Sequence, residues 1–279
     1  MNNTKVWYVT GASRGLGLTL VKKLLDRGYR VAATSRDTHS LSEAVGLIDK
    51  ERFLPLAVDL NNPDCIDESI QQTLAAFGKI DVVVNNAGYG MAGTVEEITG
   101  QHVRDIFNVN VLATIDVVKS VLPVMRSRQS GYIINMGSVA GFVGAPGWAF
   151  YSATKAAVAA FSEVLALDVK EFNINVTVVE PSNFRTGFLT KDSLAYTESK
   201  IEGYQAVKAT QERYLATNGK QPGDPARASE ILLELAEDNN PPLHLFLGQD
   251  AYNRASGKLK VMTAELEQWK ETTVSADFK

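Results

Sequence analysis

The sequence has a single cysteine and no long uninterrupted apolar run. Cys65 is the one cysteine among 279 residues, so no disulfide can form within the chain, and a reducing compartment fits this usage. The most apolar long segment, 109–125, is interrupted by Asp116 and Lys119, and residues 1–5 do not resemble a signal peptide. We therefore expect a cytoplasmic protein without a membrane span.

Strong charge of either sign is also lacking. The formal net charge is −4 and no basic cluster stands out, which argues against nucleic acid as the main partner. We expect no metal site. The apolar fraction of 45% and charged fraction of 22% are those of an ordinary globular protein, and no linker-like stretch divides the chain. The composition predicts one large α/β domain.

The stretch from Ser138 to Lys155 carries the clearest chemistry. An apolar run of strand length, 132–136, ends just before Ser138, and an Ala-rich segment of helical length begins at Tyr151. Residues four apart lie on one helix face, so Tyr151 and Lys155 can present their polar ends to one place. A connecting loop rich in glycine can return Ser138 to that place.

These three side chains suit proton transfer to a carbonyl oxygen. A nearby ammonium group favours the phenolate, so Lys155 is expected to lower the pKa of Tyr151. Ser138 would donate a hydrogen bond to the substrate oxygen and hold it within reach of Tyr151. None of these three side chains can donate a hydride, so a cofactor must supply it.

A glycine-rich turn joins a predicted strand at 6–10 to a predicted helix that runs to about Arg27. Gly11, Gly15 and Gly17 would let the backbone approach a pyrophosphate at the start of that helix, although a plain tight turn is the alternative. Ser13 also completes the Gly-x-Ser-x-Gly pattern of α/β-hydrolases. No earlier strand exists to supply an oxyanion loop, and neither His102 nor His244 has a supporting constellation, so the hydrolase alternative is weaker.

The second predicted strand, 30–34, ends in Ser35, Arg36 and Asp37. An NAD site needs a carboxylate at this strand end, whereas the 2′-phosphate of NADP needs an arginine. Arg36, with Arg14 from the glycine turn, therefore predicts NADP(H). Asp37 lies one residue too far along and is expected to cap the next helix.

Three further polar positions each have two interpretations. Asp59 and Leu60 end a predicted strand at 53–58, where Asp59 could reach the adenine or cap the helix near Pro63. The run 85–88 follows a strand at 80–84 and either packs against the cofactor or forms a turn. Asn110, inside a predicted helix at 99–125, is either a satisfied core residue or the holder of a water beside Lys155.

The rest of the chain completes an alternating pattern. A sixth strand is predicted at 174–179, a helix at 225–237 and a last strand at 243–247. Between them, 188–217 is polar and predicted to be helical without strands, forming a lid over about 187–220. The tail at 252–269 has the pattern of an amphipathic helix, and we expect 251–279 to pack on the domain formed by 1–250.

Taken together, these residues resemble those of the short-chain dehydrogenase/reductase family over essentially the whole chain to about residue 250. The likeness rests on motifs that occur in family order: Thr10-Gly11-x-x-x-Gly15-x-Gly17, Asn85-Asn86-Ala87-Gly88, Asn110, Ser138, Tyr151-x-x-x-Lys155, and Pro181 with Thr186. The Tyr89-Gly90 continuation and the segment 180–186 are similar to bacterial hydroxysteroid and retinol dehydrogenase-like members.

The resemblance implies a single doubly wound Rossmann domain with a parallel sheet of about seven strands. It also implies a catalytic set in which Lys155 additionally binds the nicotinamide ribose, and a homodimer or homotetramer. The implied catalytic residues are Asn110, Ser138, Tyr151 and Lys155. The implied cofactor-binding residues are Gly11, Ser13, Arg14, Gly15, Leu16, Gly17, Ser35, Arg36, Asp59, Leu60, Asn86, Ala87, Gly88, Tyr151, Lys155, Pro181, Ser182, Phe184 and Thr186.

The expected function is NADPH-dependent reduction of a hydrophobic ketone or aldehyde, reversible as alcohol oxidation. The pocket is expected to be apolar and aromatic. Its predicted lining residues are Tyr89, Met91, Ser138, Val139, Phe142, Val143, Trp148, Tyr151, Phe184 and Phe188. A catalytically silent NADP-binding sensor is the alternative from another class, and an epimerase or dehydratase would need a larger substrate domain than this chain has room for.

Overall fold

The core of the protein is a seven-stranded parallel sheet. In this computed structural model, which describes residues 4–46, 49, 51–191, 193–197 and 201–278, the strand order is β3-β2-β1-β4-β6-β7-β9. The strands are β1 (Val6–Val9), β2 (Arg30–Ser35), β3 (Phe53–Ala57), β4 (Val82–Asn85), β6 (Gly131–Met136), β7 (Ile174–Pro181) and β9 (His244–Leu247). Each lies within two residues of its predicted bounds, so the predicted doubly wound sheet is confirmed.

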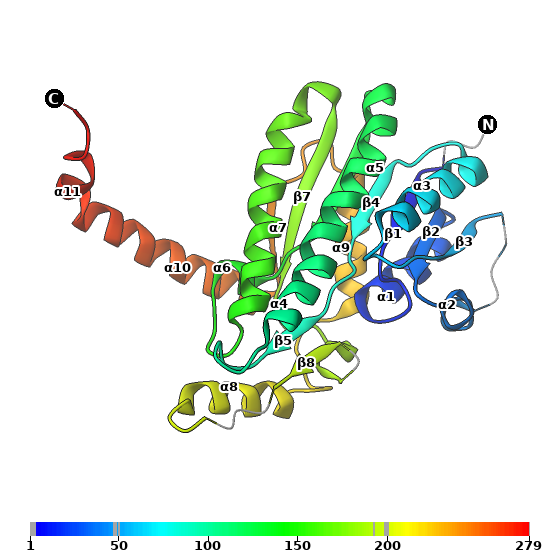
Figure 1. The fold of residues 1–279 in the computed structure, drawn as a ribbon. Helices are drawn as coiled ribbons and strands as arrows, with labels where there is room; N and C mark the ends of the chain where they lie inside the picture. The colour runs from blue at the N-terminus through cyan, green and yellow to red at the C-terminus, as the bar shows by residue number, and fades with distance from the viewer. Residues whose placement is uncertain (1–3, 47–48, 50, 192, 198–200, 279) are drawn as a thin grey trace.

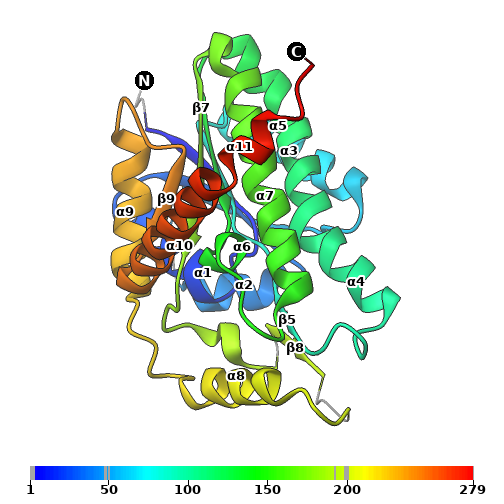
Figure 2. The ribbon, with the colours of Figure 1, turned by 90° about the vertical axis from the view of Figure 1, so that its left-hand side faces the viewer.

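Helices cover both faces of the sheet, which explains why its central strands are apolar on both sides (Figures 1 and 2). On one face, apolar side chains of α1 (Gly15–Asp26), α2 (Thr38–Val45) and α9 (Pro225–Glu237) form one buried cluster with the strands. On the other face, α3 (Pro63–Phe77), α5 (Ala113–Arg128) and α7 (Ala149–Asp168) form a second cluster. The core therefore consists of two layers that sandwich the sheet.

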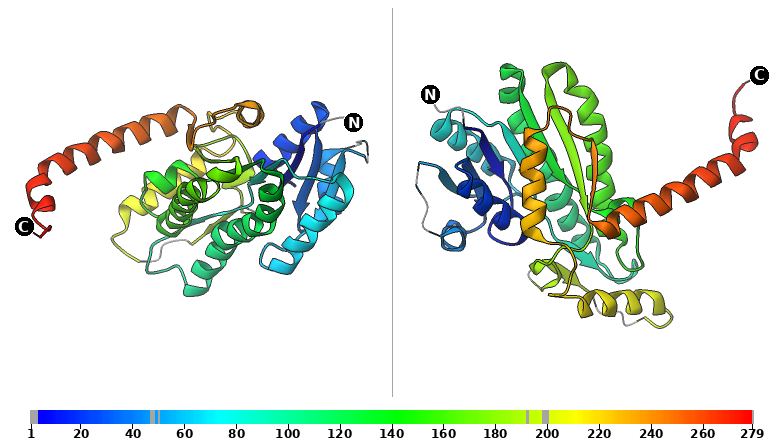
Figure 3. Two further views of the ribbon diagram at one scale, coloured as in Figure 1. Left: turned by 90° about the horizontal axis from the view of Figure 1, so that it is seen from above. Right: turned by 180° about the vertical axis from the view of Figure 1, so that it is seen from behind.

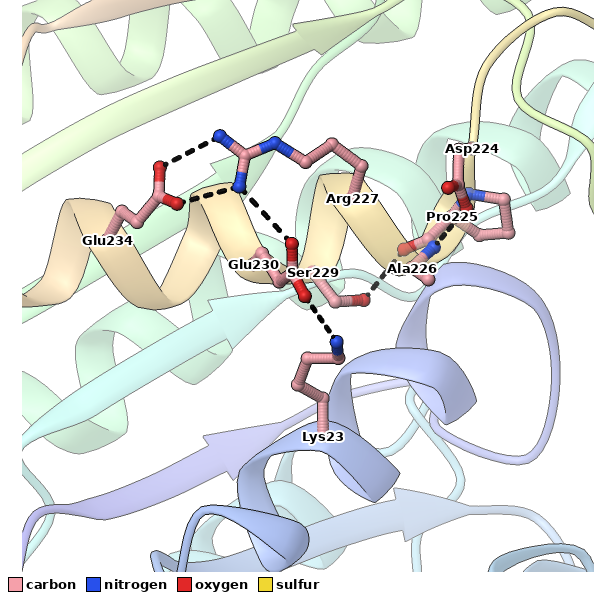
Figure 4. Close-up of polar contacts among 8 residues, drawn as sticks. All are labelled: Lys23, Asp224, Pro225, Ala226, Arg227, Ser229, Glu230 and Glu234. Carbon is pink, nitrogen blue, oxygen red and sulfur yellow. Dashed lines mark hydrogen bonds and ion pairs between the residues drawn. The ribbon is translucent and has the colours of Figure 1, made fainter.

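Polar contacts fix α9 against α1 (Figure 4). The ammonium nitrogen of Lys23, on α1, lies 2.6 Å from one carboxylate oxygen of Glu230, and the guanidinium of Arg227 lies 3.2 Å from the other. Arg227 reaches on to Glu234 at 2.7 Å. At the start of α9, Asp224 accepts a hydrogen bond from the amide of Ala226, as an N-terminal cap does. These ion pairs are partly exposed, so the apolar cluster beneath them carries most of the stabilisation.

The predicted long helix at 99–125 is interrupted by a wider turn. It consists of α4 (Gly100–Phe107), a π-helical segment (Asn108–Leu112) and α5, which together form a continuous helix, Gly100–Arg128. By length and composition alone this helix could cross a membrane, but here α5 packs on the sheet beside α3 and α7. The π segment contains Asn110, and such bulges often occur at functional sites.

The lid contains a strand that the sequence did not predict. It includes a 3₁₀ turn (Gly187–Leu189), β8 (Leu194–Tyr196) and α8 (Gln205–Ala216). β8 pairs in parallel with β5 (Gly90–Ala92), which forms a second, two-stranded sheet below the carboxyl edge of the main sheet (Figure 1). The prediction of a lid without strands was wrong, because three residues are too few to show a period of two and their partner is far away in sequence.

The tail is helical but leaves the domain. α10 (Gln249–Gln268) and α11 (Lys270–Val274) follow the last strand, and Ala251 and Ala255 are their only buried residues. Every residue from 259 to 278 is exposed, and the helix projects away from the body of the protein (Figure 3). The expectation that 251–279 packs on the domain is correct only for the first turns of α10. The remaining short helices are α6 (Val139–Phe142) and a 3₁₀ turn (Lys170–Phe172).

Candidate active site

Tyr151 and Lys155 lie on the first turns of α7, where that helix meets the carboxyl edge of the sheet. Both side chains are buried, with 7% and 5% of their surface exposed. The ammonium nitrogen of Lys155 lies 6.0 Å from the centre of the Tyr151 ring and donates a hydrogen bond of 2.7 Å to the carbonyl oxygen of Met136. The end of β6 therefore holds the lysine beside the phenol.

Ser138 reaches this pair because the short helix α6 packs tightly on α7. Its hydroxyl accepts a hydrogen bond of 3.1 Å from the amide of Ala140 and so caps α6. A Cβ atom at Gly141 would lie 2.7 Å from the backbone carbonyl carbon of Lys155, so only glycine allows this close approach. The predicted convergence of Ser138, Tyr151 and Lys155 is what the structure shows, since all three line one cleft.

Asn110 lies beneath the cleft rather than in its wall. Its side-chain oxygen accepts a hydrogen bond of 3.0 Å from the Tyr89 amide, and its nitrogen donates to the carbonyl of Tyr89 and to the hydroxyl of Thr154. Both Asn110 and the Lys155 nitrogen lie next to Gly88, at 3.0 and 3.5 Å from where a Cβ atom would be. The π segment thus places a fully bonded amide close to the lysine.

Burial controls the ionisation of the two reactive groups. It raises the pKa of Tyr151 to about 12, an effect that interaction with the Ser138 hydroxyl partly offsets. Burial also lowers the pKa of Lys155 to about 8. The expectation that Lys155 lowers the pKa of Tyr151 does not hold in the protein by itself: burial raises that pKa, and the neighbour that lowers it is the Ser138 hydroxyl.

The glycine turn forms a close-packed cradle at the start of α1. Gly11 has a φ of +65°, and a Cβ atom there would lie 2.7 Å from the Cα of Ala87. A Cβ atom at Gly17 would lie 2.5 Å from the side-chain nitrogen of Asn86, which donates to the carbonyl oxygens of Thr10 and Gly11. No side chain caps the first turn of α1, so its amide groups can bind an anion.

The predicted phosphate-binding arginines both line the cleft. Ser35 and Arg36 at the end of β2 line it together with Arg14 and Asp59. Asp37 accepts a hydrogen bond of 2.9 Å from the amide of His39 and caps α2, as predicted. The cap of α3 is Asn62, so the alternative role of Asp59 as that cap was wrong.

Most predicted site residues share a single cleft of about 480 Å³ along the carboxyl edge of the sheet. Those that line it are Gly11, Ser13, Arg14, Gly15, Leu16, Ser35, Arg36, Asp59, Leu60, Asn86, Ala87, Gly88, Tyr89, Ser138, Val139, Trp148, Tyr151, Lys155, Pro181, Ser182, Phe184, Thr186 and Phe188. The residues present form a continuous path from a cationic end, past the glycine cradle, to the aromatic surroundings of Tyr151. This shape fits an extended dinucleotide with its reactive end beside the phenol.

Three predicted substrate residues do not line the cleft. Met91, in the middle of β5, is buried in the core. Phe142 faces the opposite side of α6, where its ring packs 5.2 Å from the ring of Phe246 and the ammonium of Lys258 lies 4.7 Å above it. Val143 follows α6, and its carbonyl accepts a hydrogen bond from Arg254. Burial in the core keeps Met91 from the cleft. The predictions for Phe142 and Val143 were wrong because only Val139 and Ala140 of the single-turn helix α6 line the cleft.

The sequence missed cleft residues contributed by the lid. Tyr214 on α8 packs against Trp148 with ring centres 5.0 Å apart. Leu189, Ser193 and Gln221 line the same region. Tyr214 lies in a predominantly polar segment, and nothing in its spacing indicates that α8 returns to the Tyr151 helix.

The hydrolase alternative finds no support in this geometry. Ser13 lines the cleft, but within the described part of the chain no histidine does. His244 instead contacts Glu180 at 3.0 Å and Glu163 at 3.2 Å on the side of β7 and α7. Fold and cleft together define a Rossmann-type protein with a Ser-Tyr-Lys site.

Comparison with known proteins identifies the family. A family model described as short chain dehydrogenase matches residues 5–196. The chain is 36% identical to the oxidoreductase BOA17 of Botryotinia fuckeliana, covering 98% of this chain and 99% of that protein. It is 32% identical to a 3-ketodihydrosphingosine reductase of Bacteroides thetaiotaomicron, covering 88% of each.

A solved structure shows the same likeness in three dimensions. The short-chain dehydrogenase from Streptomyces avermitilis superimposes with a TM-score of 0.91 at 34% identity, over 100% of both chains. The chain therefore belongs to the short-chain dehydrogenase/reductase family and is an oxidoreductase, which confirms the resemblance seen in its motifs.

Proposed function

We propose that the protein reduces a hydrophobic ketone or aldehyde with NADPH and catalyses the reverse oxidation of the alcohol. The observation that carries this proposal is the meeting of Ser138, Tyr151 and Lys155 in a cleft that continues past the glycine cradle to Arg36. A nicotinamide dinucleotide bound along this path would supply the hydride.

The chain's own residues would handle the proton. Ser138 donates a hydrogen bond to the carbonyl oxygen, and the phenol of Tyr151 gives that oxygen its proton as negative charge develops. Since the pKa of Tyr151 is raised to about 12, the phenol is fully protonated at neutral pH and is available as the acid. Lys155 would bind the nicotinamide ribose, and Asn110, whose amide is bonded to Tyr89 and Thr154, would position the backbone beside Lys155.

The preference for NADPH follows from the end of β2. Arg36 lines the cleft there, and a guanidinium group pairs well with a phosphate. The carboxylate of Asp37 is used in capping α2 and accepts hydrogen bonds from the amide of His39 and the hydroxyl of Ser40. At the end of β2, Asp37 is thus engaged as a cap, and Arg36 is the charged residue that lines the cleft.

The substrate end of the cleft is aromatic. The ring of Tyr151 packs 5.5 Å from that of Trp148 and 5.8 Å from that of Phe188. Such walls favour an apolar body next to the reacting carbonyl. All three reactive side chains are present and buried together, which favours an enzyme over a catalytically silent sensor.

The proposal extends to assembly and location. We propose a homodimer or homotetramer, on the basis of family membership, in the cytoplasm, on the basis of the single cysteine. We also propose that nucleic acid is not a partner, because the net charge of the chain is weakly acidic.

The test follows NADPH absorbance with a panel of ketones, aldehydes and steroids, with NADH as the control cofactor. We expect oxidation of NADPH that depends on an added hydrophobic carbonyl compound, and slower oxidation of NADH. Equal rates with the two cofactors would contradict the cofactor preference. Absence of turnover with every carbonyl compound and alcohol tried would contradict the proposed reaction.

A further inference from the structure

Two residues of the cleft carry buried polar atoms without a hydrogen-bond partner. Gln221 is 1% exposed, and neither atom of its side-chain amide has a partner; the indole nitrogen of Trp148, which is 5% exposed, also has none. Of the atoms of this kind in the described part of the chain, only these three belong to residues that line the cleft. Unpaired buried polar groups destabilise a protein, so each needs a partner such as a ligand or water.

The ring of Trp148 lies beside the ring of the reacting phenol. Its ring lies 5.5 Å from the ring of Tyr151 and 5.0 Å from the ring of Tyr214. Its neighbours here are aromatic or aliphatic members of the buried cluster beneath the lid. The indole thus lies among aromatic and aliphatic side chains, and its N–H has no hydrogen-bond partner among them.

The backbone of Gln221 is fixed, while its side chain takes no part in fixing it. Its carbonyl oxygen accepts a hydrogen bond of 3.1 Å from the Arg185 side chain. Two residues on, Gly223 forms a bridge with Phe184, on the segment that follows β7. The fold therefore holds Gln221 at the cleft wall, and its side-chain amide makes no hydrogen bond within the protein.

We propose that Gln221 and Trp148 bind a second polar group of the substrate, a neutral group such as a hydroxyl that both donates and accepts hydrogen bonds. This inference rests on the proposed function and narrows its substrate class. The indole N–H can only donate, whereas the amide of Gln221 donates from nitrogen and accepts at oxygen. A hydroxyl accepts a hydrogen bond from Trp148 and donates one to Gln221.

Charged groups fit these atoms less well. A carboxylate only accepts hydrogen bonds and would leave the oxygen of Gln221 unpaired. Arg254, a cation that lines the cleft, already lies 3.7 Å from Asp250 and donates to the carbonyl of Val143. An ammonium group offers no acceptor to Trp148. The substrate class is therefore a hydroxyketone or hydroxyaldehyde with an apolar carbon body, and its reduced product is a diol.

The test uses matched pairs of phenyl ketones that differ by a hydroxyl at the end of the alkyl chain, namely propiophenone with β-hydroxypropiophenone and their longer homologues. The variants are Gln221→Leu and Trp148→Phe. Gln211→Leu is the control, because Gln211 is also buried but its amide is paired with the Tyr196 hydroxyl and the Thr197 carbonyl outside the cleft.

We expect the wild-type protein to have a higher kcat/KM for the hydroxylated ketone of at least one pair. The ratio of kcat/KM for the hydroxylated ketone to kcat/KM for the plain ketone of that pair should fall by about tenfold or more in Gln221→Leu and Trp148→Phe. In Gln211→Leu this ratio should not change. The ligand-free Gln221→Leu protein should melt no lower than wild type, since an unpaired amide is replaced by an apolar group of similar size. The Gln211→Leu protein should melt at a lower temperature.

Three outcomes would overturn the inference. One is an equal ratio in wild type and variants. Another is weaker NADPH binding by Gln221→Leu with an unchanged ratio, which would assign the amide to the cofactor. The third is a lower melting temperature of Gln221→Leu, which would show that the amide is already paired within the fold. If the wild-type protein reduces both ketones of every pair equally well, only this inference is contradicted. If it reduces no carbonyl compound, the proposed function is contradicted.

Discussion

At the scale of single residues, burial shifts both reactive groups of α7 toward their neutral forms. The pKa of Tyr151 rises to about 12 and that of Lys155 falls to about 8. A neutral phenol is the form that can donate a proton. The neighbouring lysine donates a hydrogen bond to the carbonyl of Met136, and the proposed function assigns it to the nicotinamide ribose.

The phenol hydroxyl can be removed with little effect on packing. In Tyr151→Phe the ring would keep its contacts with Trp148 and Phe188. We expect kcat to fall by about a hundredfold or more, because the general acid is lost, while the NADPH dissociation constant changes little. Steady-state kinetics and fluorescence titration with NADPH measure the two quantities. Retained turnover would refute the role assigned to Tyr151.

The buried lysine predicts a pH dependence of stability in the cofactor-free protein. Between about pH 8 and 10.5 the folded protein has released the proton of Lys155 while the unfolded chain still holds it. The free energy of unfolding should therefore rise with pH in this window, relative to Lys155→Met, by up to about 3 kcal/mol. Urea unfolding at several pH values tests this, and parallel pH profiles for the two proteins would contradict it.

Arg36 predicts the cofactor preference. Arg36→Asp should lower the ratio of kcat/KM with NADPH to that with NADH by about tenfold or more, since a charge-assisted contact with the 2′-phosphate is replaced by repulsion. Arg104→Asp on α4, outside the cleft, is the control and should leave the ratio unchanged. An unchanged ratio in both variants would argue against the assigned phosphate position.

At the scale of elements, the turn between β1 and α1 depends on close contacts that only glycine allows. A methyl group at Gly17 would press on the Asn86 side chain and the carbonyl of Gly11, whereas one at Gly144 would meet nothing within 4 Å. Gly17→Ala should cost about 1–3 kcal/mol of unfolding free energy and weaken NADPH binding, while Gly144→Ala should be close to neutral. Urea unfolding and NADPH titration of both variants test this, and equal effects would count against it.

The paired strands β5 and β8 show how an element can escape sequence analysis. Each has three residues, and they pair at Met91 with Ala195 although about a hundred residues separate them. A period of two cannot be seen in so short a run. The seven main strands, in contrast, are predominantly apolar runs of four to eight residues, which is why they were predicted to within two residues.

At the scale of the whole molecule, the exposed tail is separable from the folded body. Lys258 donates a hydrogen bond to the carbonyl of Phe142, and every residue from 259 to 278 is exposed. A protein ending at Lys258 should therefore unfold with nearly the same free energy as the full chain, within about 0.5 kcal/mol. Chemical unfolding of the dilute proteins tests this. A large loss would show that the tail is covered in solution, as in an oligomer.

The sequence by itself determined the main sheet, the glycine turn and the Ser138, Tyr151 and Lys155 set, because these depend on local apolar runs and on short fixed spacings. Only the tertiary structure decided the lid strand, the exclusion of Phe142 and Val143 from the cleft, the entry of Tyr214 and Gln221 into it, and the projection of the exposed tail from the domain. It also decided the direction of the Tyr151 pKa shift. These features depend on which distant segments meet and on how much solvent they exclude, and neither quantity is contained in a local pattern.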